Sequence, residues 1–222
     1  AVNAAGYDIS AACTGFVFAL NTAHAFIQAG IYRTALVIGS DVLSKLLDWT
    51  DRGTCVLFGD GAGAAVLKAE ETGVVDMLMG SDGTKGPILS CTSRTLGNFL
   101  TGTRPELGLM TMDGQEVFRF AVKKVPESIE ILLERNHISR EEIKYYVLHQ
   151  ANERIVEAAA RRLKEPMEKF PMTISKYGNT SSASIPLLLN DMAEKNMLQP
   201  GDKIILSGFG AGMTWGAVLM EW

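Results

Sequence analysis

Short apolar runs alternate along the chain with longer segments whose apolar positions recur at helical spacing, a pattern typical of an α/β protein. The short runs predict strands at residues 7–10, 35–39, 63–67, 74–79, 145–148, 203–207 and 217–220. The longer segments predict helices at residues 14–29, 115–135, 152–164 and 182–195. Residues 83–111 are rich in Gly, Thr, Ser and Pro, have little periodicity, and predict a long loop region.

Three of these segments predict more than their secondary structure. The helix at residues 14–29 is apolar on almost every side, as expected of a helix in the middle of a sizeable fold. The strand at residues 35–39 is continuously apolar, which is typical of a central strand in a parallel sheet. Pro126 lies inside the helix at residues 115–135, where we expect a kink.

The order of elements contains a weak internal repeat. Cys13 opens a helix that leads into a strand beginning at Ala35, 22 residues later, and Asn179 precedes a helix that leads into a strand beginning at Lys203, 24 residues later. A second strand follows in each case. The repeat indicates two related halves whose helix N-termini point into one shared site, although a general α/β pattern would also produce it.

Composition and charge narrow the class of protein. Of the 222 residues, 47% are hydrophobic and 21% charged, with a net charge of −4, which favours a folded domain and argues against a general nucleic-acid binder. The three cysteines are too few and too widely spaced for a disulfide framework or a zinc site. No leader and no apolar run of membrane length is present, so we expect a soluble cytoplasmic protein. The chain begins without Met and enters a predicted strand almost at once, so we expect an N-terminal part of the domain to be missing.

Cys13 stands at a predicted strand-to-helix junction, in the sequence Ala-Ala-Cys-Thr-Gly-Phe. The positive end of a helix dipole and its free N–H groups favour a thiolate. Gly15 leaves room for a ligand beside the backbone. A thiol that serves only packing is the other interpretation, and position alone does not decide between the two. Cys55 and Cys91 lack this setting and are expected to be structural or incidental.

His149 and Asn179 occupy comparable positions. His149 follows the strand predicted at residues 145–148, and the active residues of open α/β sheets gather at the carboxyl ends of strands. His24 and His137 have no such position. Asn179 precedes a predicted helix. Each residue also has an ordinary interpretation as a helix cap.

Two glycine-rich segments accompany these residues. The segment from Gly208 to Gly216 follows a strand and can expose the N–H groups of an oxyanion hole, cradle a phosphate, or form a tight structural turn. The segment from Gly59 to Gly63 precedes a strand rather than a helix and so does not fit dinucleotide binding. A thiol, an imidazole, an amide and a glycine turn, each at the end of a strand or the start of a helix, together favour one functional site over four separate structural roles.

At this point the chain resembles the β-ketoacyl-acyl carrier protein synthase III family, the initiating condensing enzymes of the thiolase-like superfamily. The motifs are Ala-Ala-Cys-Thr-Gly-Phe around Cys13, Thr-Asp-Arg-Gly-Thr at 50–54, Phe-Gly-Asp-Gly-Ala-Gly-Ala-Ala at 58–65, His-Gln-Ala-Asn at 149–152, Tyr-Gly-Asn-Thr-Ser at 177–181 and Gly-Phe-Gly-Ala-Gly-Met-Thr-Trp-Gly at 208–216. The resemblance covers essentially the whole chain. It implies two related α/β halves in an α-β-α-β-α layering, with residues 1–70 the remainder of the N-terminal half and residues 71–222 the C-terminal half, and usually a homodimer.

The resemblance also implies roles for individual residues. Cys13, His149 and Asn179 would form the catalytic triad, and the N–H groups of Cys13 and Ala211 would form the oxyanion hole. Contacts to substrate and coenzyme A would come from Arg52, Phe209, Gly114 and Asn152. Two residues depart from the family pattern: Thr14 is bulkier than the small residue expected after the cysteine, and Ala211 replaces a more usual glycine.

A basic cluster follows His149. Arg154 and Arg161 are seven residues apart and share a face of the helix predicted at residues 152–164, with Arg162 beside them. Acyl carrier proteins are small and acidic, so we expect this face to be their docking surface. The alternative is an ordinary solvated helix face.

The implied reaction is a decarboxylating Claisen condensation of an acyl-CoA primer with malonyl-acyl carrier protein, which gives a 3-oxoacyl-acyl carrier protein and initiates fatty-acid synthesis. It uses a coenzyme A thioester as substrate and needs no cofactor or metal. A related condensing enzyme that makes polyketide or quinolone precursors is one alternative. A papain-like cysteine protease has the same order of Cys, His and Asn but a different sequence around the cysteine. A non-enzymatic acyl-binding homologue would usually have lost the cysteine or the histidine.

Overall fold

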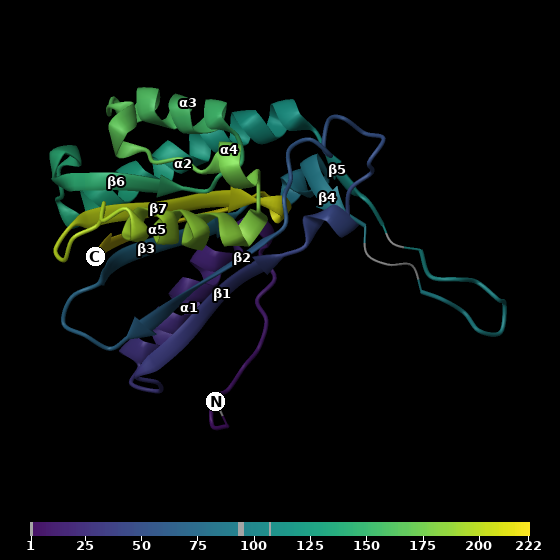
Figure 1. Cartoon of the computed structure of the whole chain (residues 1–222), viewed down its shortest axis with the longest axis horizontal. Helices are drawn as coiled ribbons and strands as arrows, with labels where there is room; N and C mark the ends of the chain where they lie inside the picture. Colours follow the sequence, from purple (N-terminus) through teal and green to yellow (C-terminus); the bar gives the residue numbers. More distant parts are fainter. Residues whose placement is uncertain (1, 93–95, 107) are drawn as a thin grey trace.

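A computed structural model describes residues 2–92, 96–106 and 108–222 and contains both helices and strands (Figure 1). The α-helices are α1 (Gly15–Gln28), α2 (Gly114–Asn136), α3 (Glu153–Leu163), α4 (Ile174–Tyr177) and α5 (Ser184–Glu194). The strands are β1 (Thr34–Asp41), β2 (Gly61–Lys68), β3 (Val74–Ser81), β4 (Leu89–Cys91), β5 (Met110–Met112), β6 (Ile143–Leu148), β7 (Lys203–Gly210) and β8 (Thr214–Glu221). Short 3₁₀ turns are η1 (Ala12–Thr14), η2 (Leu43–Lys45), η3 (Gly83–Ile88), η4 (Arg140–Glu142), η5 (Met167–Lys169), η6 (Ser181–Ala183) and η7 (Ala211–Met213).

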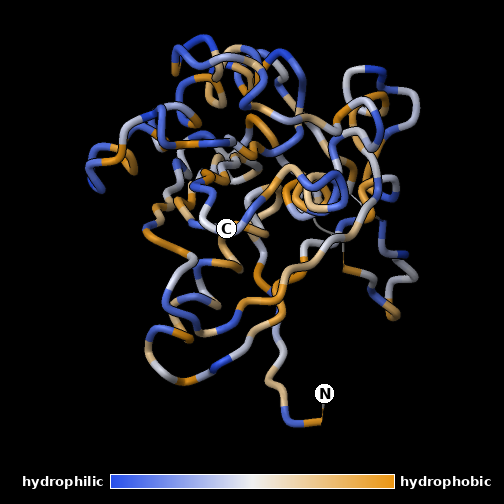
Figure 2. The backbone as a smooth tube through the Cα atoms, turned by 60° about the vertical axis from the view of Figure 1, so that its left-hand side comes forward, coloured by the Kyte–Doolittle hydropathy of each residue, from blue (hydrophilic) through white to orange (hydrophobic). Residues whose placement is uncertain are grey.

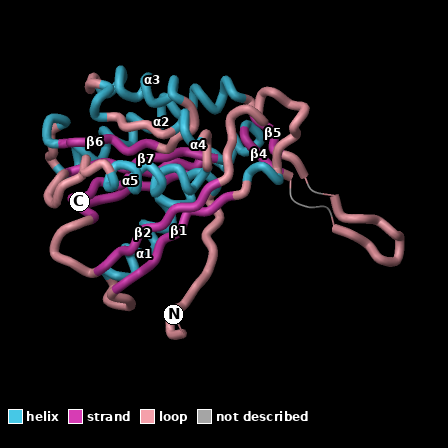
Figure 3. Tube along the Cα trace, in the orientation of Figure 1, coloured by secondary structure: helices cyan, strands magenta, loops and turns pink. Residues whose placement is uncertain are grey.

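A four-stranded sheet with the order β3-β8-β7-β6 forms the centre of the molecule. Strands β6 and β7 are parallel, and the other two pairs are antiparallel. Helices α2 and α3 cover one face, α1 and α5 cover the other, and the antiparallel pair β1–β2 lies beyond α1 and α5 (Figures 1 and 3). The chain therefore forms four consecutive layers, α-β-α-β, of the five-layered α-β-α-β-α order that was expected.

Strand alternation divides the apolar side chains between two cores. In β7, Ile205 faces the core beneath α2 and α3, whereas Ile204 and Leu206 face the core beneath α1 and α5. In β6, Tyr146 and Val147 divide in the same way. Because burying one such aliphatic side chain stabilises a fold by roughly 1.5–3 kcal/mol, this sheet with both faces covered is the stable platform of the molecule.

Polar caps set the ends of the two long surface helices. Asp113 caps α2 by accepting hydrogen bonds from the N–H groups of Gln115 and Glu116, and Asn152 caps α3 by accepting one from the N–H of Arg154. At their C-termini, a residue with positive φ follows each helix. Helix α2 continues through Pro126 as one element. The helices predicted at residues 115–135 and 152–164 are thus confirmed to within one residue at each end.

Three sequence-based expectations about the outer segments need correction. Residues 7–10 have no regular secondary structure, because no strand of the described ranges pairs with them in a ladder of hydrogen bonds. Strand β1 was expected to be a central strand of a parallel sheet, but within the described residues it pairs only with β2, in antiparallel orientation. The predicted loop at residues 83–111 contains the turn η3 and the short antiparallel pair β4–β5. Residues 93–95 and 107 of that loop lie outside the described residues.

The outer face of the β1–β2 pair is apolar. Leu36 and Ile38 point outward from β1, and Val66, which pairs with Leu36 in the register, points outward from β2. Across the described residues no helix is both long and apolar enough to cross a membrane, and Figure 2 shows hydrophobic and hydrophilic residues interleaved along the backbone.

Candidate active site

Cys13 lies in the 3₁₀ turn η1, directly before α1, with 8% of its surface exposed. The hydroxyl of Thr14 fixes this turn, because it donates to the carbonyl of Ala11 at 2.6 Å and lies 2.6 Å from the hydroxyl of Thr214. The larger residue after the cysteine is therefore accommodated by two hydrogen bonds in the interior. Cys13 and Ala211 line the same groove, whose volume is about 1510 Å³.

Two glycines of β7 let the strand run against Cys13 and His149. A Cβ atom at Gly210 would lie 2.8 Å from the Cys13 nitrogen and 2.9 Å from its Cβ, closer than side chains tolerate. A Cβ atom at Gly208 would lie 3.4 Å from the Cβ of His149 and 3.9 Å from the carbonyl oxygen of Cys13. Strand β7 therefore lies close against both Cys13 and His149.

His149 follows β6, and its N–H donates to the carbonyl of Ser207 in β7 at 2.8 Å. Its ring packs edge-on against Phe209, with the ring centroids 5.4 Å apart, and its Nδ1 lies 2.6 Å from the hydroxyl oxygen of Ser184. Only 2% of the residue is exposed, and this burial lowers the pKa of His149 to about 3. The imidazole is therefore neutral at physiological pH and carries one ring proton.

Asn179 is anchored to the segment before β2 by its backbone. Its N–H donates to Leu57, and its carbonyl accepts from Gly59, each at 2.9 Å. In the side chain, Oδ1 accepts from the N–H of Ser181 at 2.9 Å. Because Oδ1 is engaged in this way, the NH₂ group of Asn179, which makes no hydrogen bond within the described part of the chain, remains available as a donor.

The Cys13 thiol is neutral in this structure. Burial raises its pKa to about 11; a hydrogen bond with Ser181 opposes that shift, and the charge of Asp41 adds to it. Asp41 is held by Ser182, which donates to it from its N–H at 3.0 Å and from its hydroxyl at 2.5 Å. The expectation that the helix N-terminus favours the thiolate is thus outweighed by burial.

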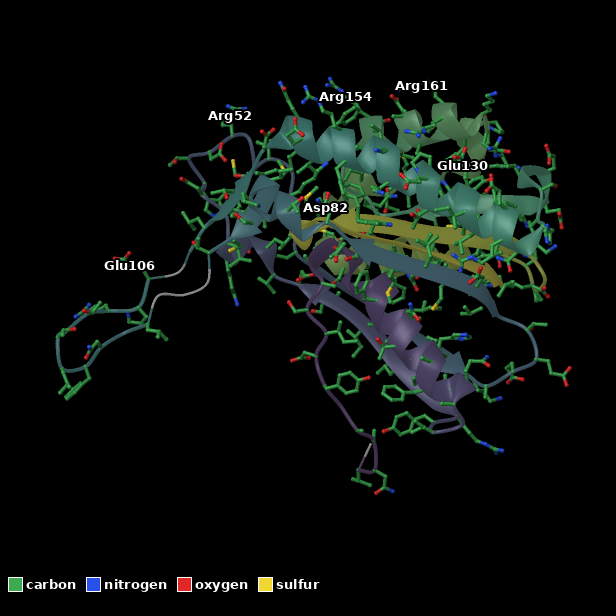
Figure 4. The ribbon with its side chains drawn as sticks, turned by 180° about the vertical axis from the view of Figure 1, so that it is seen from behind. Arg52, Asp82, Glu106, Glu130, Arg154 and Arg161 are labelled. Atoms are coloured by element: carbon green, nitrogen blue, oxygen red, sulfur yellow. The ribbon has the colours of Figure 1, made fainter. Side chains whose placement is uncertain are left out.

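The residues expected to contact coenzyme A are dispersed. Phe209 is buried against His149, whereas Arg52 is exposed and points outward from its loop (Figure 4). Gly114, the first residue of α2, lies in a shallow hollow together with Gly53, which follows Arg52 in the chain. Asn152 caps α3 through Oδ1, as described above. None of the residues lining that hollow lines the groove of Cys13.

The three arginines of α3 differ in their contacts. Arg154 and Arg161 are exposed and point outward from the same edge of the molecule (Figure 4). Arg161 lies 3.6 Å from Glu157, a surface pair that contributes little to stability. Arg162 instead donates to the carbonyl of Val122 in α2 at 3.2 Å. All three arginines are exposed, and Arg162 is in addition tied to α2, so the docking surface remains a prediction.

Three polar residues in the site were not predicted from the sequence. Ser184 contacts His149, Ser181 contacts both Asn179 and Cys13, and Asp41 contacts Ser182. The two serines belong to the small polar run after Asn179, which reads simply as the start of a helix. Asp41 ends β1, and only the tertiary fold brings it to the site.

Comparisons with known proteins agree with this geometry. Two sequence-family models match: 3-oxoacyl-[acyl-carrier-protein] synthase III over residues 7–83 and the C-terminal part of the same family over residues 133–222. The β-ketoacyl-[acyl-carrier-protein] synthase III of Clostridium acetobutylicum is 49% identical, and the alignment covers all of this chain and 69% of that protein. The synthase III of Clostridium novyi is 50% identical with the same coverage.

A solved structure shares the fold as well. The crystal structure of 3-oxoacyl-[acyl-carrier-protein] synthase III from Aquifex aeolicus superposes with a TM-score of 0.88 at 40% identity, over 97% of this chain and 67% of that one. The arrangement is therefore the thiolase-like α/β fold, spanning about two thirds of the full structure. With both family models, these identities and the groove around Cys13 in agreement, the chain belongs to the β-ketoacyl-acyl carrier protein synthase III family, the acyltransferases that condense acyl-CoA with malonyl-acyl carrier protein to initiate fatty-acid synthesis.

Proposed function

We propose that Cys13 is the acyl-accepting nucleophile and that His149 and Asn179 are the hydrogen-bond donors for the condensation. The assignment rests on one observation: in each of these two side chains the acceptor atom already has a hydrogen-bond partner within the protein. Nδ1 of His149 is hydrogen-bonded to the Ser184 hydroxyl, and Oδ1 of Asn179 accepts from the Ser181 N–H. Each side chain therefore keeps an N–H for a ligand. Two neutral donors suit an oxygen that gains negative charge during the reaction.

In the first step the sulfur of Cys13 attacks the thioester carbon of acyl-CoA. The carbon–sulfur bond to coenzyme A breaks, the acyl group moves to Cys13, and the proton of the thiol leaves with the coenzyme A thiol. Cys13 and Ala211 line the same groove, and their N–H groups stabilise the oxyanion of the tetrahedral intermediate. Because burial keeps the free thiol protonated, proton removal accompanies attack rather than preceding it.

In the second step malonyl-acyl carrier protein loses CO₂, and the electron pair of the broken carbon–carbon bond forms an enolate. His149 and Asn179 donate to the enolate oxygen. The enolate carbon attacks the acyl-cysteine, a carbon–carbon bond forms, and the Cys13 sulfur leaves as a thiolate that regains a proton. A neutral imidazole with its N–H toward the oxygen can donate without competing for a second proton.

The remaining assignments are parts of the same proposal. Arg52, Gly114 and Asn152 contact coenzyme A, Phe209 shapes the acyl end of the site, and the exposed pair Arg154 and Arg161 receives the acyl carrier protein. The protein acts in the cytoplasm as a homodimer. Residues 1–70 and 71–222 are parts of its two related halves.

Mass spectrometry after incubation with acyl-CoA tests the nucleophile. Acetyl-CoA or a short branched acyl-CoA is expected to add one acyl group to the peptide that contains Cys13, and the preferred donor reports the primer class. Cys55→Ser and Cys91→Ser serve as matched controls and should acylate normally. Acylation that persists in Cys13→Ser, or that maps to another cysteine, would overturn the assignment.

A further inference from the structure

Ser184 is the first residue of α5 and the direct neighbour of the His149 ring. It is 98% buried, with 2% of its surface exposed. Its hydroxyl oxygen lies 2.6 Å from Nδ1 of His149 and accepts a hydrogen bond from the backbone N–H of Gln150 at 3.3 Å. The serine therefore contacts both the histidine ring and the backbone of the residue that follows it.

Counting the available protons shows which atom is the donor in the 2.6 Å contact between Ser184 and Nδ1 of His149. The N–H of Gln150 can only donate, so the Ser184 oxygen is an acceptor there and its own proton must go elsewhere. Among the described residues, Nδ1 of His149 is the only acceptor within hydrogen-bonding distance of that hydroxyl. The hydroxyl therefore donates to Nδ1, which must be the unprotonated nitrogen of the ring.

A neutral imidazole has one N–H, so a hydrogen bond received at Nδ1 places the ring proton on Nε2. The opposite tautomer would set two hydrogens against each other at 2.6 Å or force the serine proton into a buried position without an acceptor. Leaving a buried polar group unsatisfied is costly, so this tautomer is disfavoured.

We propose that Ser184 is a positioning residue that holds His149 in its Nε2–H tautomer and so makes the ring a hydrogen-bond donor toward the reacting thioester oxygen. The inference rests on the proposed function for the identity of the acceptor, but the tautomer itself is independent of it. The backbone of His149 is already fixed through Ser207, so the serine sets the state of the ring rather than the position of the chain.

The tautomer is measured directly by ¹⁵N NMR of the full chain labelled at histidine nitrogens. The chain has three histidines, and the signals of His149 are identified as those that are missing from the spectrum of His149→Gln. In the unmodified protein Nδ1 of His149 is expected to have the chemical shift of an unprotonated, hydrogen-bonded nitrogen and Nε2 that of a protonated one. A protonated Nδ1 would overturn the proposal without any variant having to fold.

Ser184→Ala removes the donor and supplies the kinetic test. Decarboxylation of malonyl-acyl carrier protein is expected to fall about tenfold, the factor that corresponds to roughly 1.4 kcal/mol of lost transition-state stabilisation. Acylation of Cys13 should stay within about twofold, and the His149 nitrogen shifts should move toward a mixture of tautomers. Ser184→Thr keeps a hydroxyl and is expected to recover most of the rate and the original shifts.

Ser128→Ala is the matched control. Ser128 is as deeply buried as Ser184, but its hydroxyl donates to Val125 within its own helix. It also lies 3.4 Å from the hydroxyl of Ser207, which keeps its own bond to the carbonyl of Gly216 without it, so neither half-reaction nor the His149 shifts should change. Unchanged nitrogen shifts in Ser184→Ala would overturn the role of the serine. Loss of the tautomer signature together with normal decarboxylation would instead contradict the proposed role of His149, so the two failures are distinguishable.

Discussion

Ala12 and Ser181 are the first residues of the 3₁₀ turns η1 and η6, and both have a backbone in the left-handed region, with φ of 46° and 52°. Each turn passes directly into a helix, and each helix is followed by an antiparallel strand pair. For a residue other than glycine this conformation costs roughly 1–2 kcal/mol. Such strain persists where the surroundings fix the backbone, most often at functional sites. Here it aims the following residues, Cys13 and Ser182, at the site.

Substitutions at Ala12 test that strain. Ala12→Val should lower the free energy of unfolding by about 2 kcal/mol or more, because a β-branched side chain is poorly tolerated at positive φ. Ala12→Gly should stay within about 1 kcal/mol of the unmodified protein, because relief of strain is offset by greater freedom of the unfolded chain. Urea denaturation measures both. Equal stability of the two variants would show that the turn is not strained in solution.

The two equivalent helix starts of the internal repeat were predicted directly from the spacing of residues in the sequence. The spacing from Cys13 and Asn179 to the strands that follow predicted two equivalent helix starts. In the structure Cys13 lies within the 3₁₀ turn that leads into α1, and Asn179 lies two residues before the 3₁₀ turn that leads into α5. The strand predicted at residues 7–10 failed for a physical reason: a strand is defined by its neighbours, and apolar alternation cannot show whether a neighbour is present.

Within the site, sequence reasoning identified the residues that carry reactive groups but not those that tune them. Cys13 and His149 are unusual enough in type and position to be noticed. Ser184 and Asp41 are ordinary residues whose importance comes from long-range contacts with His149 and with Ser182. The expected thiolate also failed, because the depth of burial that raises the pKa of Cys13 is set by β7 and η6 packing over it and not by the local helix start.

Replacing the two donor residues should separate the half-reactions. His149→Ala and Asn179→Ala are each expected to reduce decarboxylation of malonyl-acyl carrier protein by a hundredfold or more, the order of magnitude for loss of one oxyanion donor. Transfer of the acyl group from coenzyme A to Cys13 should persist at a measurable rate in both. The two rates are measured by CO₂ release and by protein mass. Equal loss of both steps would identify His149 as the base that activates the thiol.

The buried neutral imidazole should make the fold sensitive to acid. Because the pKa of His149 is about 3 in the folded chain and near 6.5 when exposed, the unfolded chain binds more protons between these values. The contribution of His149 to stability is therefore complete above pH 6.5 and is lost progressively as the pH falls toward 3. Denaturation at pH 7 and pH 4.5 should show a smaller loss for His149→Gln than for the unmodified protein. An identical loss would mean that the ring is not buried in its neutral form.

The thiol should respond in the opposite direction. Burial raises the pKa of Cys13 from 9.0 to about 11, so the folded chain binds more protons between these values and its stability falls as the pH rises through them. In the absence of substrate, alkylation of Cys13 by iodoacetamide should keep accelerating from pH 9 to pH 11, because only the thiolate reacts. Peptide mapping follows the site. A rate that levels off below pH 8 would indicate an activated thiolate.

Charge reversal on α3 tests the docking of the acyl carrier protein. Arg154 and Arg161 are exposed on one edge of the molecule, and Arg161 forms a weak surface pair with Glu157. Arg154→Glu combined with Arg161→Glu should reduce turnover with malonyl-acyl carrier protein by about tenfold or more, since rim charges act mainly by steering an oppositely charged partner. Transfer from acyl-CoA to Cys13 should stay within about twofold, because that step does not use the carrier protein.

Ionic strength and a control on the opposite layer decide whether that loss is electrostatic docking. The defect should be largest at low salt and shrink as salt is added, because exposed charges are screened beyond about 10 Å at 0.1 M. Compared with the single variant Arg154→Glu, Arg33→Glu makes the same change in charge on an exposed arginine that precedes β1, in the layer beyond α1 and α5 on the other side of the central sheet from α3, and should leave both half-reactions unchanged. If Arg33→Glu lowered turnover as much, the effect would come from net charge and not from α3. If both half-reactions fell together in the α3 variant, the helix would be supporting the site rather than receiving the carrier protein.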